Sequence, residues 1–330
     1  MDMRRPAPGD GVDEGSDIAG RLSGSDARGK AVAATLPVNG TNSVEKLAAR
    51  PARLVSSRAC IDMNPHLLSF AWLCCLVGML LVPGCATGAG AAPKTLRILT
   101  YNIHHGEGLD GKVDLVRISE LITNLQADIV CLNEVDKGVT RTKGRDLTAE
   151  LAALTRMTGV FSNNYHYQGG EYGNAILSRY PVISSKNTHF KMLRAGEQRG
   201  ILQVRIDAGG REVVFMATHI DYRPDDTERL GNVDEIAGLL AGYPGKPVIV
   251  AGDFNDTPGK RVHSKMKERF RDAWEEAGQG DGLTIPVKKP TKRIDYIWLE
   301  RSAPLKVKEI TVPYSEASDH LPLFSVLEWK

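Results

Sequence analysis

The sequence predicts an α/β protein whose main domain, residues 94–330, is a mixed sandwich of strands and helices. About nine short apolar or alternating runs predict strands, and a few amphipathic helices separate them, which is typical of layered α/β domains. With 42% hydrophobic and 25% charged residues among 330, the chain can bury a sizeable core. No linker rich in Pro or Ser divides residues 94–330, so we expect one domain there.

Charge and cysteine content exclude several classes of protein. The formal net charge of +2 gives no global field that would commit the chain to nucleic acid or to an anionic membrane. Aromatic residues make up 6% of the chain, which argues against a stacking platform for single-stranded nucleic acid. Of the five cysteines, Cys131 alone lies beyond the first hundred residues, in an apolar run typical of a core. The main domain therefore has no disulfide framework and no cysteine-based zinc site.

The first 93 residues do not resemble a folded domain. Residues 1–62 are rich in Gly, Ala, Ser, Asp and Arg without an apolar period, so we expect disorder or a mis-assigned extension, with Met63 as the true start. Residues 63–93 hold an apolar block shorter than the ~20 residues of a spanning helix, followed by Val82-Pro83-Gly84-Cys85. This pattern resembles a bacterial lipoprotein signal, in which the cysteine is lipidated after cleavage. An uncleaved anchor is the alternative, and Ala/Gly-rich flanks disfavour a buried helix. Either anchor places the main domain outside the cytoplasm, attached to a membrane of the cell envelope.

The first half of the main domain alternates strands and helices. Residues 96–102 alternate like a half-buried strand, and residues 115–125 carry apolar side chains on one helical face. A second buried strand is predicted at 127–135, followed by a helix at 147–157. Asp114 and Asp146 are placed to cap the two helices.

The second half is richer in strands. Residues 247–251 are an apolar run that leads into Gly252-Asp253-Phe254-Asn255, where Asp253 and Asn255 would project to one side if extended pairing persisted. A basic amphipathic helix is predicted over 260–277, and another helix over 227–240. The remaining strands are predicted at 173–179, 201–206, 212–220, 293–299, 305–312 and 321–329.

Polar side chains that can bind metals and phosphates gather at the ends of these strands. Ligands commonly bind just past the carboxyl ends of strands. Carboxylates without cysteine suit Mg²⁺ or Mn²⁺, and two histidines beside them can deprotonate a water and stabilise phosphoryl charge. Each residue alone could be a turn or surface residue, but their joint occurrence predicts a hydrolytic site. The set is Asn102, Glu134, Asn174, His219, Asp253, Asn255, Asp295, Asp319 and His320.

Seven short motifs occur in order along residues 94–330. They are Thr100-Tyr101-Asn102, Leu132-Asn133-Glu134-Val135, Tyr172-Gly173-Asn174-Ala175-Ile176-Leu177-Ser178, Thr218-His219, Gly252-Asp253-Phe254-Asn255, Arg293-Ile294-Asp295-Tyr296 and Ser318-Asp319-His320. Together they resemble the endonuclease/exonuclease/phosphatase superfamily. The resemblance implies a Mg²⁺-dependent phosphoesterase, with Mn²⁺ as an alternative ion. We also expect a monomer. It also implies a deoxyribonuclease I-like four-layer α/β/β/α sandwich of two mixed sheets flanked by helices.

The resemblance also implies roles for individual residues. Glu134 matches the metal-binding glutamate, with Asn102 and Asp319 as further members of the metal and phosphate shell. Asp253 matches the aspartate that activates the attacking water, and Asn255 the amide that holds the phosphate beside it. The other matches are His320, which contacts the scissile phosphate; Asp295, which orients His320; His219, which assists the leaving group; and Asn174 and Arg199, which contact phosphate. One departure is Asn133, where the family usually has glutamine.

The substrate stays open at this level. Branches of the superfamily cut DNA, RNA, inositol phosphates, sphingomyelin and other phosphodiesters with the same core. The basic run 288–293 could bind a polyanion, although such runs are common on solvated loops. The segments His104-His105-Gly106 and Gly169-Gly170-Glu171-Tyr172-Gly173-Asn174 resemble a bacterial subgroup whose eukaryotic relatives act in glycosylphosphatidylinositol remodelling. Nucleic acid, a phospholipid headgroup and a small phosphodiester therefore remain candidate substrates, and a non-catalytic lipoprotein of this fold is the alternative from another class.

Overall fold

The computed structural model describes residues 93–330. The predictions for residues 1–62, for the apolar block and for lipidation of Cys85 lie outside the described residues. Within 93–330, no helix is both long and apolar enough to cross a membrane.

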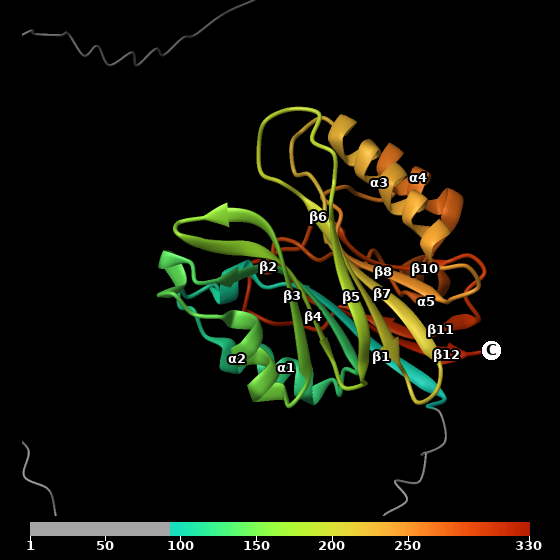
Figure 1. Cartoon of the computed structure of the whole chain (residues 1–330), viewed down its shortest axis with the longest axis horizontal. Helices are drawn as coiled ribbons and strands as arrows, with labels where there is room; N and C mark the ends of the chain where they lie inside the picture. Colours follow the sequence, from blue (N-terminus) through green and yellow to red (C-terminus); the bar gives the residue numbers. More distant parts are fainter. Residues whose placement is uncertain (1–92) are drawn as a thin grey trace, which may run out of the picture. The chain divides into compact units, whose positions relative to one another are not determined.

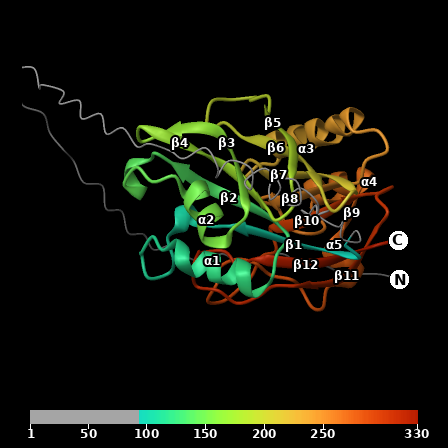
Figure 2. The same ribbon diagram turned by 60° about the horizontal axis from the view of Figure 1, so that its bottom comes forward.

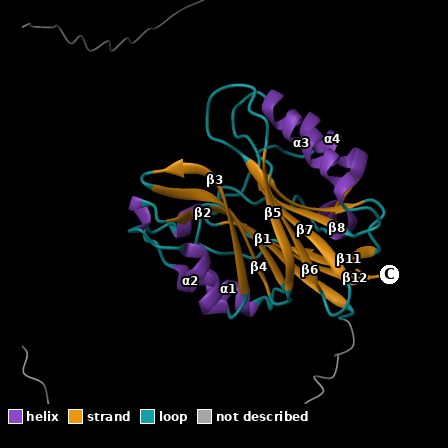
Figure 3. Ribbon diagram, in the orientation of Figure 1, coloured by secondary structure: helices purple, strands orange, loops and turns teal. Residues whose placement is uncertain are grey.

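Two six-stranded sheets pack face to face, and helices cover both outer faces (Figures 1 and 3). In the turned view, α1 and α2 again lie against one sheet while α3 and α4 lie against the other (Figure 2). The four layers implied by the family resemblance are confirmed. The helices are α1 (Leu115–Asn124), α2 (Leu147–Thr155), α3 (Thr227–Leu239), α4 (Arg261–Arg269) and α5 (Ala273–Ala277).

Each sheet contains one parallel pair among antiparallel neighbours. The first has the order β11-β12-β1-β2-β4-β3, with β1 parallel to β2, and the second the order β5-β6-β7-β8-β10-β9, with β7 parallel to β8. In the first sheet the strands are β1 (Thr95–Asn102), β2 (Ile129–Lys137), β3 (Thr158–Tyr167), β4 (Gly170–Ser178), β11 (Leu305–Thr311) and β12 (Leu323–Trp329). In the second they are β5 (Val182–His189), β6 (Gly200–Asp207), β7 (Glu212–His219), β8 (Val248–Asp253), β9 (Phe270–Asp272) and β10 (Asp295–Glu300).

The core follows from the two-residue period of the strands. In β1, Leu96 and Ile98 face the second sheet, whereas Leu99 and Tyr101 face α1 and α2. Cys131 is a buried free cysteine between the sheets, as predicted. Because both faces of each sheet are covered, the central strands are apolar on both sides, and each fully buried Leu or Ile contributes roughly 1.5–3 kcal/mol.

The predicted helix caps are confirmed at the first two helices. Oδ1 of Asp114 accepts from the backbone N–H of Val116 at 2.9 Å, and Oδ1 of Asp146 accepts from that of Ala149 at 2.9 Å. A cap of this kind typically contributes about 1 kcal/mol by satisfying an N–H that has no partner inside the helix.

The single helix predicted over 260–277 is wrong. That segment forms α4, the short strand β9 and α5. Phe270 is buried in the core, and β9 pairs antiparallel with β10, which places Asp272 opposite Trp298. Oδ1 of Asp272 then caps α5 through the N–H of Trp274 at 2.9 Å. Pairing with a neighbouring strand therefore overrides the local helical pattern.

Three strands were not predicted, β3, β5 and β9. Residues of β3 and β5 are largely exposed or half-buried because these strands lie at sheet edges, so they lack a clean apolar alternation. β9 has three residues, too few for any periodic signal.

Candidate active site

The polar residues predicted at strand ends meet at one edge of the sandwich. In the first sheet Asn102 pairs with Asn133 across the parallel β1 and β2. In the second sheet Asp253 lies between His219 of β7 and Asp295 of β10. Parallel strands deliver their last residues to the same edge, which explains why residues distant in the chain converge here.

Asn133 joins the two sheets directly beneath this site. Its fully buried Nδ2 donates to Oδ1 of Asn174 at 2.8 Å and to the carbonyl of Thr218 at 2.9 Å, while its Oδ1 accepts from the N–H of Asp253 at 3.1 Å. The amide thus links β2 and β4 of one sheet to β7 and β8 of the other. Leaving one such buried group unpaired costs about 1–3 kcal/mol. From the sequence, Asn133 stood out only because the family usually has glutamine there, and its position between the two sheets was not predicted.

Gly252 permits the close approach of β7 and β8 beside Asn133. Its φ is +142°, and a Cβ there would lie 1.8 Å from the carbonyl oxygen of Thr218. A side chain at this position would therefore force the two strands apart.

A bulge in β2 directs Glu134 toward the site. The register of β2 against β4 shifts between Leu132 and Val135, and Glu134 has a φ of +59°, which residues with a Cβ rarely adopt. Nδ2 of Asn102 donates to Oε1 of Glu134 at 2.9 Å and to Oδ2 of Asp253 at 3.2 Å. The amide therefore separates two carboxylates, one from each sheet. Strained backbone held by its surroundings is typical of functional sites.

His320 and Asp295 form a buried ion pair. Nδ1 of His320 lies 2.8 Å from Oδ2 of Asp295, and its Nε2 lies 3.7 Å from Oδ2 of Asp253. Burial alone would lower the pKa of His320, but the carboxylate of Asp295, then those of Asp253 and Asp319, outweigh burial and raise the pKa to about 10. The imidazolium is therefore the resting form at neutral pH.

The pKa of Asp253 is also raised, but in a carboxylic acid a raised pKa favours the neutral form. Burial, followed by repulsion from Asp295, raises the pKa of its carboxyl group, against the lowering influence of His320 and of the hydrogen bonds from Asn255 and Asn102. Its Oδ2 lies 3.5 Å from Nε2 of His219, so both histidines approach the same oxygen. A divalent cation nearby would favour the ionised carboxylate.

His219 is held as a neutral imidazole. Burial and the positive charges of Arg199 and His320 lower its pKa well below the ordinary value. Nδ2 of Asn255 lies 3.0 Å from Nε2 of His219 and also donates to the carbonyl of Ile220 at 3.2 Å. Since Asn255 donates here, Nε2 accepts, and the proton of His219 sits on Nδ1, which is buried without a hydrogen-bond partner among the described residues.

Asn255 reaches His219 by a turn rather than by continued extension. β8 ends at Asp253, and Asn255 has a φ of +47°. Its backbone N–H donates to Oδ1 of Asp253 at 2.8 Å, which fixes the carboxylate that the turn leaves behind. The condition that extended pairing persists through Asn255 is not met, because the aspartate side chain stabilises a tight turn.

Three predicted residues lie at the margin of this cluster. Asn174 is buried, and both ends of its amide are bonded, to Asn133 and to the carbonyl of Gly200 at 3.3 Å. Arg199 is 7% exposed and pairs with Glu197 at 3.0 Å, while its Nε has no partner among the described residues. Asp319 is half-buried and accepts from the hydroxyl of Ser318 at 3.3 Å. Their proposed contacts with metal or phosphate stay predictions.

Ser318 was quoted within a motif but given no role. Its Oγ is buried and donates to the carbonyl of Asn102 at 2.7 Å, so it ties the loop that carries Asp319 and His320 to the end of β1. Its position immediately before Asp319-His320 is the signal that could have identified it.

The donor set fits a divalent cation. The Asn102 amide joins the carboxylates of Glu134 and Asp253, and Asp319 precedes His320, so oxygen donors without sulfur gather here. Asp253, Asp295 and His320, whose polar atoms lie within 4.8 Å of one another, border these donors. Oδ1 of Asp295 is buried without a hydrogen-bond partner among residues 93–330. An unpaired buried carboxylate oxygen beside other carboxylates is costly unless a positive charge compensates it.

The basic run 288–293 divides into separate surroundings. Lys288 and Lys289 are exposed, whereas Arg293 is 4% exposed and binds Asp272 at 2.8 Å. The Arg293 guanidinium also lies 4.8 Å from the centre of the Tyr296 ring. The run is therefore not one polyanion-binding surface.

Known proteins share this sequence and architecture. Residues 99–320 match the model of the Endonuclease/Exonuclease/phosphatase family. The chain is 30% identical over 244 residues to protein YbhP of Escherichia coli (strain K12), covering 69% of this chain and 94% of that protein.

Two solved structures show the same fold. One is an endonuclease/exonuclease/phosphatase from Beutenbergia cavernae, with a TM-score of 0.61, 24% identity and 72% of each chain covered. The other, from Bacteroides vulgatus, has a TM-score of 0.61 and 20% identity and covers 72% of this chain and 100% of that one. With the site at the strand ends, the family match is decisive: this chain belongs to the Endonuclease/Exonuclease/phosphatase family, whose members are metal-dependent phosphoesterases.

Proposed function

We propose that residues 94–330 hydrolyse phosphodiester bonds with a water molecule activated by Asp253. The observation that carries this proposal is the position of Oδ2 of Asp253, within 3.2 Å of the Asn102 amide and 3.5 and 3.7 Å of two histidines from different elements. A carboxylate so placed can accept a proton while the His320 imidazolium stabilises developing charge on phosphate oxygens.

Each side chain has a separate role in the proposed hydrolysis. Asp253 takes the proton of the water as its oxygen attacks phosphorus, and the bond from phosphorus to the leaving oxygen breaks. The His320 imidazolium, held by Asp295, donates a hydrogen bond to a phosphoryl oxygen. His219 and Asn255 bond to each other in this structure, and on substrate binding both would turn, His219 toward the leaving oxygen and Asn255 toward the phosphate. Arg199 and Asn174 complete the phosphate contacts.

Glu134, Asn102 and Asp319 would hold the ion, which we propose is Mg²⁺, with Mn²⁺ as a substitute. Oxygen donors without sulfur are the ligands these ions prefer. When bound, the ion supplies positive charge that neutralises the phosphate and favours the ionised form of Asp253.

Chelation is expected to abolish hydrolysis, and Glu134→Gln should raise the Mg²⁺ concentration needed for half-maximal rate at least ~10-fold, because one anionic ligand is lost. The measurement is a Mg²⁺ and Mn²⁺ titration of initial rate, with Glu120→Gln, which changes a remote exposed glutamate on α1, as the control. Activity that survives chelation unchanged would remove the metal from the proposal.

A substrate panel tests the function itself. Plasmid DNA, RNA, sphingomyelin, phosphatidylinositol, and generic mono- and diester reporters should be compared at one Mg²⁺ concentration. Hydrolysis of a diester above the monoester supports the proposal. Cleavage of nucleic acid identifies a nuclease, and cleavage of a lipid headgroup identifies a lipid phosphodiesterase. Binding without hydrolysis across the panel would instead favour a non-catalytic lipoprotein of this fold.

We further propose that the protein is anchored at the cell envelope through Cys85, with the domain outside the cytoplasm. The apolar block followed by Val82-Pro83-Gly84-Cys85 supports this anchor. Mass spectrometry of the membrane fraction of the native host is expected to find a mature N-terminus at an acylated Cys85. An intact peptide spanning residues 70–90 in the mature protein would contradict it, and a Cys85→Ala variant provides the matched control.

A further inference from the structure

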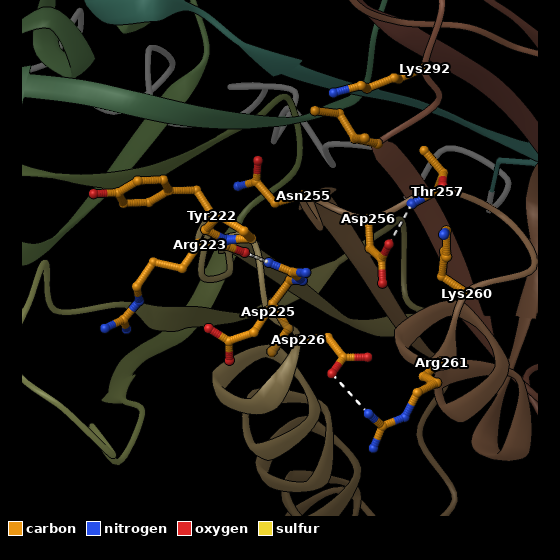
Figure 4. A pocket seen from close by; sticks show the side chains of 13 residues that line it. Tyr222, Arg223, Asp225, Asp226, Asn255, Asp256, Thr257, Lys260, Arg261 and Lys292 are labelled. Carbon is orange, nitrogen blue, oxygen red and sulfur yellow. Dashed lines mark hydrogen bonds and ion pairs between the residues drawn. The ribbon is translucent and has the colours of Figure 1, made fainter. Parts of the chain in front are cut away.

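A cleft of about 620 Å³ adjoins the candidate active site. Asn255, which contacts His219, also lines this cleft, so the two are continuous. Its walls come from the segment after β7, the segment after β8 and the first turn of α4, with Lys292 on the side of β10 (Figure 4). The cleft therefore lies where a substituent of a phosphoester bound at Asp253 would extend.

The cleft is lined by five cationic side chains and three carboxylates. Two of the carboxylates are neutralised by arginines: Asp225 by Arg194 at 2.8 Å and Asp226 by Arg261 at 3.0 Å, the latter pair marked in Figure 4. The carboxylate of Asp256 accepts only from the N–H of Thr257, at 2.9 Å, among the described contacts. The cleft therefore keeps one free carboxylate.

The cationic side chains that have no carboxylate partner outnumber the one free carboxylate, that of Asp256. Lys260 and Lys292 are exposed, and neither forms an ion pair with another residue of the 93–330 segment. Arg229 is 5% exposed; its Nη1 binds the carbonyl of Asp221 at 3.3 Å, but its buried Nε has no partner within 93–330. Arg229 therefore adds a buried positive charge to the wall of the cleft, beside the two exposed lysines.

Tyr222 connects the cleft with the phosphate-contacting side of the site. It is 61% exposed, and its ring centre lies 5.6 Å from the guanidinium carbon of Arg199. An exposed aromatic ring beside cationic groups offers a flat apolar surface next to the charges. A ligand can therefore place a ring or sugar on Tyr222 and an anionic group between the lysines.

Building on the function proposed above, we propose that this cleft binds a second phosphate group of the substrate, one carried on a substituent of the scissile phosphodiester. Lys260 and Lys292 supply exposed point charges and Arg229 a buried positive charge behind them, a combination that suits a phosphate dianion. The substrate class is then a small phosphodiester that also bears a phosphate monoester.

Calorimetry of the full-length chain in EDTA tests binding without metal-dependent turnover. The probes are thymidine 5′-phosphate and thymidine 3′,5′-bisphosphate, which differ only in the second phosphate. We expect the bisphosphate to bind at least ~10-fold more tightly, and the difference to vanish in Lys260→Met/Lys292→Met. The matched control, Lys288→Met/Lys289→Met, makes the same change in net charge with exposed lysines outside the cleft, and it should keep the difference. Equal loss in both double variants would show a general charge effect and overturn the proposal.

Binding of inorganic phosphate shows whether the cleft takes free phosphate or a phosphate group carried by the substrate. If free phosphate binds as tightly as the bisphosphate, and the cleft lysines are needed for both, the cleft holds a free anion and not part of a substrate. Weak binding of free phosphate beside tight binding of the bisphosphate supports the proposal.

A kinetic arm separates this inference from the proposed hydrolysis. With Mg²⁺, thymidine 5′-(4-nitrophenyl phosphate) carrying a 3′-phosphate should show a KM at least ~10-fold below that of the compound without it, and the cleft variant should remove the advantage. Rates with bis(4-nitrophenyl) phosphate, which lacks a second phosphate, should stay unchanged. No release of nitrophenol from any reporter would contradict the proposed hydrolysis while calorimetry still decides the cleft. Hydrolysis of both thymidine compounds with equal KM would overturn the cleft proposal alone.

Discussion

Asp253→Asn is expected to lower turnover at least ~10²-fold while leaving substrate binding nearly unchanged. The amide cannot accept the proton of the attacking water, and this contact matters most as the new bond forms. KM should therefore move far less than kcat. The measurement is steady-state turnover on the diester that the substrate panel identifies, with Asp234→Asn, an exposed residue paired with Lys265, as the control.

The same substitution should not weaken the fold. Without a metal, the pKa of Asp253 lies near 7 in the folded protein against 3.8 ordinarily, so between these values the folded state binds more protons than the unfolded state. Stability therefore falls as pH rises through this window. A neutral side chain removes that loss, and the metal-free variant should melt at or above the wild-type temperature at pH 8. Wild-type turnover in a correctly folded variant would exclude Asp253 as the base.

His320→Ala is the second substitution with a large expected effect, again at least ~10²-fold on kcat. The imidazolium is held beside Asp295 at 2.8 Å, and its contact with a phosphoryl oxygen should strengthen as charge develops there. His189→Ala, at an exposed histidine of β5, is the control.

The pH profile gives this prediction a sharper form. Activity should fall as pH rises through the raised pKa of His320, about 10, because the neutral imidazole is a poorer donor. In Asp295→Asn the main raising influence is lost, so burial lowers the pKa of His320 and the alkaline limit should move to lower pH. An unshifted alkaline limit in Asp295→Asn, with activity retained, would show that His320 does not act as the charged donor.

The periods of most central strands and of the first helix predicted a mixed α/β sandwich, and the family resemblance implied its four layers. The exceptions have physical causes. β3 and β5 lie at sheet edges with little apolar alternation, and β9 exists because Phe270 and Asp272 find partners on β10 and Arg293. Partners distant in the chain leave no local signal, so residues 260–277 resembled one helix.

The sequence predicted the residues of the candidate site better than the backbone features and contacts that position them. Asp253, His320, Asp295, His219 and Glu134 were found because charged residues after apolar runs stand out and match a family pattern. Three supporting features were not predicted: the bulge that turns Glu134, the left-handed turn at Asn255 and the link from Ser318 to β1. They depend on strand register and backbone angles. Their effects are geometric and carry no distinctive residue type.

The Asn133 amide makes catalysis depend on docking of the two sheets. Its bonds to Asn174 in one sheet and to Thr218 and Asp253 in the other form only when the interior between them has closed. A partly collapsed chain that retains its strands but not this docking cannot align Asp253 with Glu134. Activity should therefore report the docking of the two sheets, and a chain whose sheets have not docked is expected to be inactive.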